Sequence, residues 1–287
     1  MAPVTAPADP RTVLVTGTSS GIGLATAVRA AVSGRRVVAT LREPGRGDAL
    51  RAAADAAGVG DRLEIVRLDV TEPESVATAV AGVISAYGRL DAVVNNAGVG
   101  RLGTVEQIGV DAFRSVLETN FLGAVEVTRA ALPHLRATGG RLIAVSSLGG
   151  LIGQPFNEAY CAAKFALEGF LESLAPVAAS TGVTVTVVEP GPVASEFVTR
   201  LTPSVPGLLE NAGPYEAAFK AYLGATAGLF EQAQSADDAA ATVIEVLDAE
   251  RPPFRVQTSD AARGLAAIKL ADLDGAAVQA FTTPWLS

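Results

Sequence analysis

The first two thirds of the chain alternate short apolar runs with longer alanine-rich stretches. The short runs are nearly continuous in valine, isoleucine and leucine, as in strands that are buried on both faces. We predict these strands over 12–17, 35–41, 62–70, 90–98 (with its loop), 140–147 and 183–191. The longer stretches between them predict helices over 23–34, 47–58, 72–88, 109–137 and 157–181. Strands that alternate with helices indicate a parallel sheet with right-handed crossovers.

This pattern predicts an α/β fold, a single doubly wound Rossmann-type domain with helices on both faces of a parallel sheet of about seven strands. Past residue 192 the pattern loosens, and we expect weak helices over 195–232 to form a substrate lid. A helix over 235–250 and a last strand over 252–258 follow. There is no linker or internal repeat, so we expect one domain over 11–287, preceded by a flexible tail over 1–10.

The stretch "TGTSSGIG" (16–23) leaves the first predicted strand and opens the first helix. Its glycines permit a tight turn, a close approach of the backbone to a pyrophosphate and close helix–strand packing. The amides of the helix N-terminus then face a phosphate. The predicted nucleotide contacts here are Gly17, Ser19, Ser20, Gly21, Ile22 and Gly23. A purely structural turn is the alternative.

The second strand ends in "ATLRE", where a protein that binds NAD usually carries an acidic residue for the ribose hydroxyls. Leu41 takes that place and Arg42 follows it. A guanidinium suits a 2′-phosphate, so NADP(H) is favoured over NAD(H). The alternative is a solvated Arg42 that pairs with Glu43.

Further cofactor contacts are predicted where the next two strands end. Asp69, followed by Val70, ends the third strand, where a carboxylate can accept a hydrogen bond from the adenine amino group. The sequence "NNAG" ends the fourth, close to the expected path of the adenine ribose. The residues that we assign there are Asn95, Asn96, Ala97 and Gly98.

The candidate chemistry centres on "YCAAK" (160–164). Tyr160 and Lys164 are four apart and share one face of a helix. A tyrosine pKa of ~10 is too high for efficient proton transfer near neutrality, and a lysine cation nearby would lower it. Ser147, at the end of the fifth strand, can hold a carbonyl oxygen, and Asn120 can tether a water that leads towards Lys164. Two exposed helix residues are the alternative for the Tyr160–Lys164 pair alone.

Taken together, "TGTSSGIG", "NNAG", Asn120, the serine pair at 146–147, "YCAAK" and "PGPV" resemble the short-chain dehydrogenase/reductase family, from residue 11 to about residue 260. The resemblance implies a tetrad of Asn120, Ser147, Tyr160 and Lys164, with the lysine also holding the nicotinamide ribose. It implies that one further segment lines the nicotinamide, through Pro190, Gly191, Val193 and Ser195.

The stretches "ATLRE", "GGLIGQPFNEAYCAAKFALEGFLESLA" and "PPFRVQTSD" are similar to estradiol-type 17-beta-hydroxysteroid dehydrogenases and related retinol dehydrogenases. That implies a bulky apolar substrate. The estradiol type implies a lid histidine and a C-terminal glutamate, and this chain has no histidine after His134 and no acid in its last twelve residues. Near Tyr160 and Ser147, the predicted pocket residues are Leu148, Gly149, Leu151, Phe156 and Asn157.

The predicted lid carries apolar side chains that suit such a substrate: Phe197, Leu201, Leu208, Leu209, Tyr215, Phe219, Tyr222 and Phe230. The alternative is that they pack the lid onto the domain.

Composition and net charge argue against several other kinds of partner and site. The chain has 287 residues and a net charge of −8, with no basic run, which argues against nucleic acid as a partner. Cys161 is the only cysteine, so no intrachain disulfide can form, a reducing and therefore cytoplasmic location is expected, and no metal site is predicted. No uncharged apolar stretch reaches the ~18 residues that a membrane span needs.

The sequence therefore predicts an NADP(H)-dependent oxidoreductase that interconverts an alcohol and its ketone or aldehyde, with a homodimer or homotetramer implied by the resemblance. A reductase of small or acyl-chain carbonyls, a non-catalytic NADP(H)-binding regulator and an interaction protein without cofactor remain alternatives.

Overall fold

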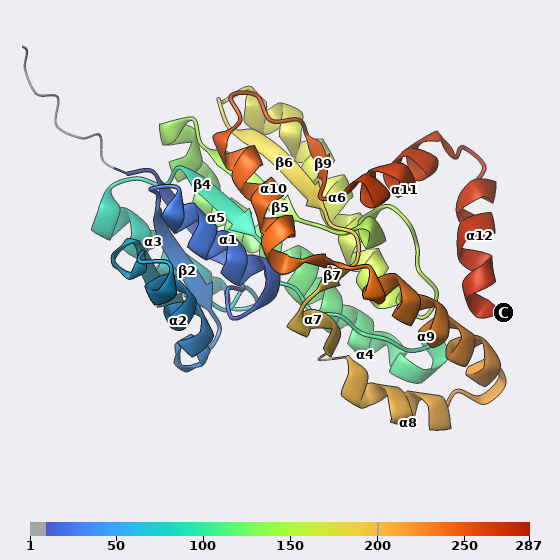
Figure 1. Ribbon diagram of the computed structural model, residues 1–287. Coiled ribbons are helices and arrows are strands. Elements are labelled where there is room, and N and C mark those ends of the chain that lie inside the picture. Colours follow the sequence, from blue (N-terminus) through green and yellow to red (C-terminus); the bar gives the residue numbers. More distant parts are fainter. Residues whose placement is uncertain (1–9, 200) are drawn as a thin grey trace, which may run out of the picture.

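The computed structural model describes residues 10–199 and 201–287, so the predicted tail falls, except for residue 10, outside the described residues. In the described part of the chain the main sheet has seven strands, in the order β3-β2-β1-β4-β5-β6-β9. Every neighbouring pair is parallel, which confirms the predicted doubly wound sheet (Figure 1). The strands are β1 (Thr12–Thr16), β2 (Arg36–Leu41), β3 (Leu63–Arg67), β4 (Ala92–Asn95), β5 (Arg141–Val145), β6 (Thr184–Glu189) and β9 (Arg255–Gln257).

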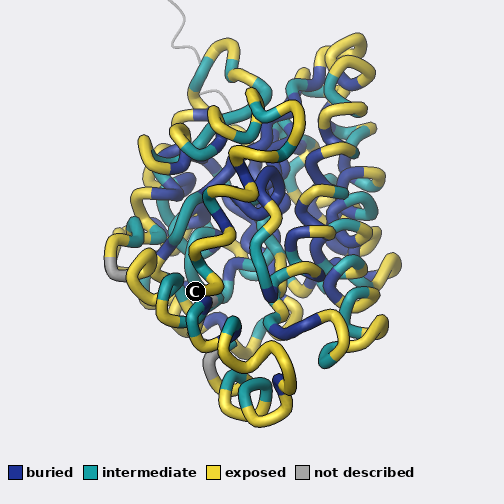
Figure 2. Tube along the Cα trace, turned by 90° about the vertical axis from the view of Figure 1, so that its right-hand side faces the viewer, coloured by how far each residue is buried: buried dark blue, intermediate teal, exposed yellow. Residues whose placement is uncertain are grey.

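Helices cover both faces of the sheet, and the central strand shows how. Successive side chains of a strand point to opposite faces. In β1, Val13 and Val15 belong to one core with α1 (Gly21–Val32), α2 (Asp48–Ala56) and α10 (Ala236–Asp248). Leu14, between them, belongs to a second core on the other face. The helices of that face are α3 (Pro73–Tyr87), α5 (Gly123–Thr138) and α6 (Glu158–Ala179). Figure 2 shows the buried positions along the middle of the molecule.

The predicted helix over 109–137 consists of three segments in the structure. The first, α4 (Val105–Leu117), begins earlier than predicted because Thr104 and Gln107 form a capping box, and it is kinked at Gly109, where φ is 62° and ψ is 170°. A π-helical turn, Glu118–Leu122, then leads into α5. A π turn inside a helix often marks a functional site, and this one carries Asn120.

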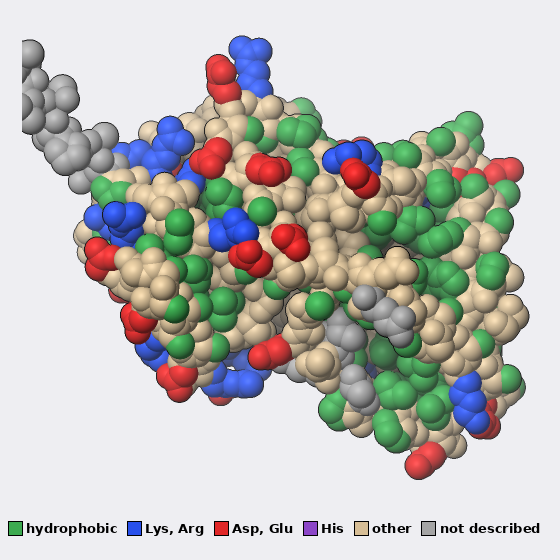
Figure 3. All heavy atoms as spheres, in the orientation of Figure 1, with side chains coloured by type: hydrophobic (Ala, Val, Ile, Leu, Met, Phe, Trp, Pro, Cys, Tyr) green, Lys and Arg blue, Asp and Glu red, His purple; other side chains and the backbone are tan. Residues whose placement is uncertain are grey.

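The region after β6 has two parts. The predicted lid contains α7 (Glu196–Thr199), α8 (Val205–Glu210) and α9 (Glu216–Glu231), between the paired strands β7 (Val193–Ala194) and β8 (Gln234–Ser235). After β9 the chain forms α11 (Asp260–Ala271) and α12 (Ala276–Thr282), which we did not predict. Figure 1 places α12 beside α9, and Figure 3 shows hydrophobic side chains gathered over this side of the molecule.

Across the described ranges, no helix combines the length and the apolar character that a membrane crossing requires.

Candidate active site

The predicted nucleotide loop is built by glycines that admit no side chain. The amides of Gly17 and Thr18 both donate to the carbonyl of Thr40, at 3.1 Å, and Gly17 has a φ of +70°. A Cβ on Gly17 would lie 2.7 Å from the Cα of Ala97. A Cβ on Gly23 would lie 2.3 Å from the carbonyl oxygen of Gly17. The loop therefore needs glycine at both positions, and it lies between β1 and β4, where the strand order reverses.

Asn96 and Thr16 hold this loop in place. The Nδ2 of Asn96 donates to the carbonyl oxygens of Thr16 and Gly17, at 2.9 and 3.0 Å. The hydroxyl of Thr16 accepts hydrogen bonds from the amides of Asn96 and Ala97, both at 3.0 Å. The side chain of Asn96, which we predicted beside the adenine ribose, thus binds the loop itself.

The loop and the N-terminus of α1 make a cradle that fits a dinucleotide. The Ser20 side chain, at the N-cap, forms no hydrogen bond that caps the helix, and first-turn amides have no partner inside a helix. Across from them lies the segment predicted to line the nicotinamide: a Cβ on Gly21 would lie 3.3 Å from the Cβ of Ser195. Amides that face a narrow, side-chain-free space suit the pyrophosphate of a nicotinamide dinucleotide.

Two further cofactor candidates lie along the neighbouring strand ends. Arg42, just after β2, has a side chain that is 66% exposed, and its Nε lies 3.9 Å from Oε1 of Glu43. This long, solvated ion pair leaves the guanidinium accessible to a ligand. Asp69 accepts hydrogen bonds at Oδ1 from the amide and the hydroxyl of Thr71, at 3.0 and 2.8 Å. Val70 is buried against Gly123 of α5.

The structure brings Ser147, Tyr160 and Lys164 together at the carboxyl ends of the strands. Ser147 follows β5, accepts a hydrogen bond from the amide of Gly149 at 3.0 Å, and lies close enough to Tyr160 to lower the pKa of the phenol. Lys164 is 4% exposed, and its Nζ donates to the carbonyl of Val145 at 2.8 Å. The same Nζ lies 5.8 Å from the centre of the Tyr160 ring. The predicted pair therefore faces the site and is not two exposed helix residues.

Burial controls the proton equilibria of this pair. Burial raises the pKa of Tyr160 to about 12, and the hydrogen bond from Ser147 opposes that rise. Burial lowers the pKa of Lys164 to about 8, and the charge of Glu168 opposes that fall. The direction for Tyr160 is opposite to the one that we predicted from its lysine neighbour. The reason is that desolvation of the phenolate dominates while the ammonium binds Val145.

Asn120 connects the π turn to the loop after β4. Its Oδ1 accepts from the amide of Val99 at 2.7 Å, and its Nδ2 donates to the carbonyl of Val99 at 2.8 Å. These bonds bring Asn120 beside the predicted cofactor residue Gly98. Its tethering of a water stays a prediction.

The predicted substrate residues separate into different surroundings. A Cβ on Gly149 would lie 3.0 Å from Cε1 of Tyr160, so Gly149 flanks the ring of Tyr160. Leu148 and Leu151 are buried in a cluster with residues of α11 and α12. Asn157 occupies the N-cap position of α6 without a side-chain capping bond, and its Nδ2 donates to Oε1 of Gln154 at 3.2 Å.

Phe156 joins this loop to the lid. It is the one non-glycine residue of the described chain with a positive φ, 59°, and its ring lies 4.8 Å from that of Phe219 and 5.4 Å from that of Tyr222. Leu208 and Leu209 border the same cluster. These lid residues therefore pack the lid onto the domain, as the alternative prediction had it, while Tyr215 and Phe230 stay exposed.

The sequence did not show which contacts the residues around Tyr160 make. Phe197 of α7, predicted only as part of the lid, lies near Tyr160, with the two ring centres 5.5 Å apart. Gly100 lies under Phe197, since a Cβ there would be 2.8 Å from its Cζ. Trp285 lies 6.3 Å from Tyr222, ring to ring, and its being the only tryptophan of the chain was the available hint.

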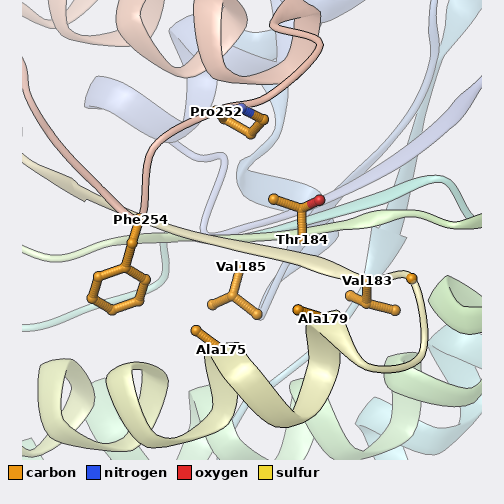
Figure 4. Close-up of a pocket in the computed structure, with 8 residues that line it drawn as sticks. Ala175, Ala179, Val183, Thr184, Val185, Pro252 and Phe254 are labelled. Carbon is orange, nitrogen blue, oxygen red and sulfur yellow. The ribbon is translucent and has the colours of Figure 1, made fainter.

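The hollow drawn in Figure 4 is not part of this site. It measures about 330 Å³ and lies where β6 starts, at the amino end of the sheet, away from Tyr160. Its lining is mostly apolar: Ala175, Ala179, Gly182, Val183, Thr184, Val185, Pro252 and Phe254.

Comparison with known proteins gives close relatives over most of the chain. A model of the short chain dehydrogenase family matches residues 11–205. Retinol dehydrogenase 8 of Bos taurus is 41% identical over 277 residues, which cover 93% of this chain and 87% of that protein. The 17-beta-hydroxysteroid dehydrogenase type 1 of Homo sapiens is 39% identical over 270 residues, which cover 92% of this chain and 82% of that protein.

Solved structures show the same fold. A short-chain dehydrogenase from Streptomyces avermitilis has a TM-score of 0.75 and 32% identity, covering 98% of this chain and 97% of that one. A short chain dehydrogenase/reductase from Burkholderia phymatum in complex with NAD has a TM-score of 0.78 at 22% identity, covering 93% and 95%. The structure of ElxO with NADP bound has a TM-score of 0.73 at 22% identity, covering 89% and 99%.

Proposed function

Since this chain belongs to the short-chain dehydrogenase family, whose members include oxidoreductases of CH–OH groups, we propose that it interconverts a bulky apolar alcohol and its ketone or aldehyde with NADP(H). The observation that carries this proposal is the convergence of Ser147, Tyr160 and Lys164 beside the glycine loop, at the carboxyl end of the sheet.

In the proposed mechanism, the nicotinamide supplies or accepts the hydride at the carbon that bears the oxygen. Ser147 donates a hydrogen bond to that oxygen and holds it near the phenol of Tyr160. In reduction Tyr160 gives its proton to the oxygen, and in oxidation it takes that proton back. With a pKa raised to about 12, Tyr160 is protonated at neutral pH, as the reductive direction needs.

Lys164 stabilises the phenolate that forms when Tyr160 gives up its proton. A buried phenolate without a counter-charge is costly, and the ammonium is 5.8 Å from the ring. Asn120 lies on the π turn, where a water bound to it can return a proton towards Lys164.

The cofactor preference rests on Arg42 and on the absence of an acidic residue at position 41. The guanidinium stands at the end of β2, is accessible and has only a long contact with Glu43. A 2′-phosphate accepts charge-assisted hydrogen bonds from such a group.

The apolar substrate rests on the lid and on the relatives. Phe197 covers Tyr160, and the cluster around Phe219 closes the lid with hydrophobic side chains. The relatives at about 40% identity are named for retinol and for a hydroxysteroid, both bulky apolar alcohols. That the protein is a homodimer or homotetramer, and that it is cytoplasmic, remain predictions.

The test is the initial rate of NADPH or NADH oxidation with estrone, retinal and small aromatic or aliphatic ketones. We expect turnover with NADPH on a bulky apolar ketone. Turnover on small ketones alone would favour the alternative of a reductase of small carbonyls. NADPH binding without any turnover would favour the alternative of a non-catalytic NADP(H)-binding regulator.

The variant Tyr160→Phe tests the mechanism. It should lose about a hundredfold to ten-thousandfold in turnover and retain NADPH binding, because only the transferred proton is removed. Tyr87→Phe is the matched control, since the hydroxyl of Tyr87 bonds Glu64 on the surface. Equal activity in Tyr160→Phe would remove Tyr160 from the mechanism.

A further inference from the structure

Behind Lys164 lies a group of buried charges that the mechanism above does not use. Glu168 stands one turn further along α6, Glu189 ends β6, and Arg255 belongs to β9. The side chains of Glu168, Glu189 and Arg255 are 5%, 0% and 19% exposed. With Lys164, two cations face two carboxylates, so the buried group is electrically balanced.

Arg255 fixes Glu168 from the edge of the sheet. Its Nη1 donates to Oε2 of Glu168 and to Oε1 of Glu189, the latter at 2.7 Å. Gln257 donates to the other oxygen of Glu189, also at 2.7 Å. The second nitrogen of Arg255, Nη2, binds the exposed carboxylate of Glu172 at 2.6 Å.

The other carboxylate oxygen of Glu168, Oε1, lies near Ser146, the residue that follows β5. Oε1 of Glu168 and Oγ of Ser146 are both buried without a hydrogen bond of good geometry, although the Ser146 hydroxyl is close enough to lower the pKa of Glu168. A Cβ on Gly150 would lie 2.6 Å from Oγ of Ser146 and 3.0 Å from Oε1 of Glu168. Ser146 follows Val145, whose carbonyl binds Lys164, so Lys164 and Glu168 contact adjacent residues of one strand.

An ammonium buried as deeply as that of Lys164 needs a nearby counter-charge, or it loses its proton. The charged groups that face this region are Glu168 and Glu172 from α6, Glu189 from β6 and Arg255 from β9, while β5 and the residue after it contribute the carbonyl of Val145 and the hydroxyl of Ser146. Among them, Glu168 is buried four residues after Lys164 on the same face of α6, and its charge opposes the fall in the pKa of Lys164.

We propose that Glu168 is a positioning residue of the reaction: its carboxylate, held by Arg255, is the buried counter-ion that keeps Lys164 protonated. The last strand of the sheet thereby takes part in the electrostatics of an active site that it does not touch. The carboxylate must itself be charged to act, and burial raises its pKa to about 7 although Ser146 and Arg255 lower it. Below the pKa of Glu168 the counter-charge is lost, and Lys164 holds its proton less tightly.

The chain offers a direct measurement, because Lys164, Lys220 and Lys269 are its only lysines. In protein labelled with ¹³C at the lysine ε-carbon, NMR follows each lysine through its own titration, without cofactor. In Glu168→Gln we expect the midpoint of Lys164 to fall by about one pH unit, a tenfold change in the ratio of ammonium to amine. Lys220 and Lys269 are internal references, and Glu172→Gln is the matched control that should leave Lys164 unchanged.

Arg255→Gln provides an independent arm if Glu168→Gln does not fold. It removes the cation that lowers the pKa of Glu168, so Glu168 takes up a proton and the midpoint of Lys164 should fall, as in Glu168→Gln. A Lys164 midpoint that stays at its wild-type value in either folded variant overturns the inference, because a purely structural role for Glu168 would alter stability alone.

The inference rests on the proposed role of Lys164, but the two fail separately. The lysine titration is read in the free protein, whereas Tyr160→Phe is read in turnover. If both hold, the pH dependence of turnover in Glu168→Gln should shift down on its alkaline side together with the Lys164 midpoint.

Discussion

The nucleotide-binding half, up to the end of β6, and the half formed by the lid and the C-terminal helices use glycine in opposite ways. At Gly17 and Gly23 an added Cβ would meet backbone within 2.7 and 2.3 Å. At Gly207, Gly224 and Gly228, in the lid helices, it would meet nothing within 4 Å. At these two positions of the glycine loop, backbone packs against backbone and leaves no room for a side chain. The lid is specified by apolar side chains, whose volumes can be exchanged, so it is the part in which substrate preference can vary.

The variant Gly23→Ala should have the largest effect, and it tests whether the glycine loop excludes every side chain. The new methyl would meet Asn96 and the carbonyl of Gly17, neither of which can move without opening the loop. We expect a loss of about 1–3 kcal/mol in the free energy of unfolding and a loss of NADPH binding, measured by denaturant titration and by fluorescence.

Gly82→Ala is its matched control. Gly82 lies inside α3 with open space around its Cα, and alanine there should stabilise the protein by up to about 1 kcal/mol. If Gly23→Ala binds NADPH as the wild type does, the nucleotide half is less strictly specified than the distances indicate.

Phe219→Ala probes the lid. Phe219 is 0% exposed and contacts Phe156 and Tyr222, so its truncation leaves a cavity in the lid cluster. We expect the KM for a bulky ketone to rise about tenfold or more, on the scale of 1.4 kcal/mol per tenfold, with NADPH affinity unchanged. Phe230→Ala, at a side chain that is 39% exposed, should change neither constant. A parallel loss of NADPH affinity in Phe219→Ala would show that the two halves are not independent.

Arg42→Ala sharpens the account of the nucleotide half. Removal of one charge-assisted contact should weaken NADPH binding about tenfold and leave NADH binding unchanged. Arg46→Ala, an exposed arginine four positions along, is the control. An equal loss for both nucleotides would mean that Arg42 does not contact the 2′-phosphate.

The rate at which Cys161 is labelled tests whether α12 packs against α6. Of the changes considered, this one should affect activity least. It lines a hollow of about 430 Å³ together with Phe165 of α6 and Gln279 and Thr282 of α12. Burial raises the pKa of this thiol to about 11, so little thiolate exists at pH 8. Labelling by a thiol reagent should be about a hundredfold slower in the native than in the unfolded protein, and should accelerate with rising pH. Equal rates would mean that α12 does not cover Cys161 of α6.

Local patterns predicted much of this molecule. Nearly continuous apolar runs predicted the strands of the main sheet, because parallel strands are buried on both faces. The Tyr160–Lys164 spacing predicted a shared helix face, because four residues make about one turn. What pattern cannot show is which distant residues meet. Glu168 reads as a solvated helix residue until Arg255, 87 positions away, is seen to bind it. Nor did α11 and α12 carry a pattern from which we predicted them.

The strand order also determines when the sheet can form during synthesis. β1 lies between β2 and β4, and the amide of Thr12 binds Asp91, 79 positions along the chain, at 2.7 Å. At roughly 5–20 residues per second, the ribosome takes at least about 4 s to supply that partner. Glu168 waits longer for its partner, because Arg255 is 87 positions beyond it, whereas Glu189 waits for the same arginine over 66 positions. A nascent chain that stops before β9 would therefore leave both carboxylates without Arg255 and β6 as an unpaired edge strand.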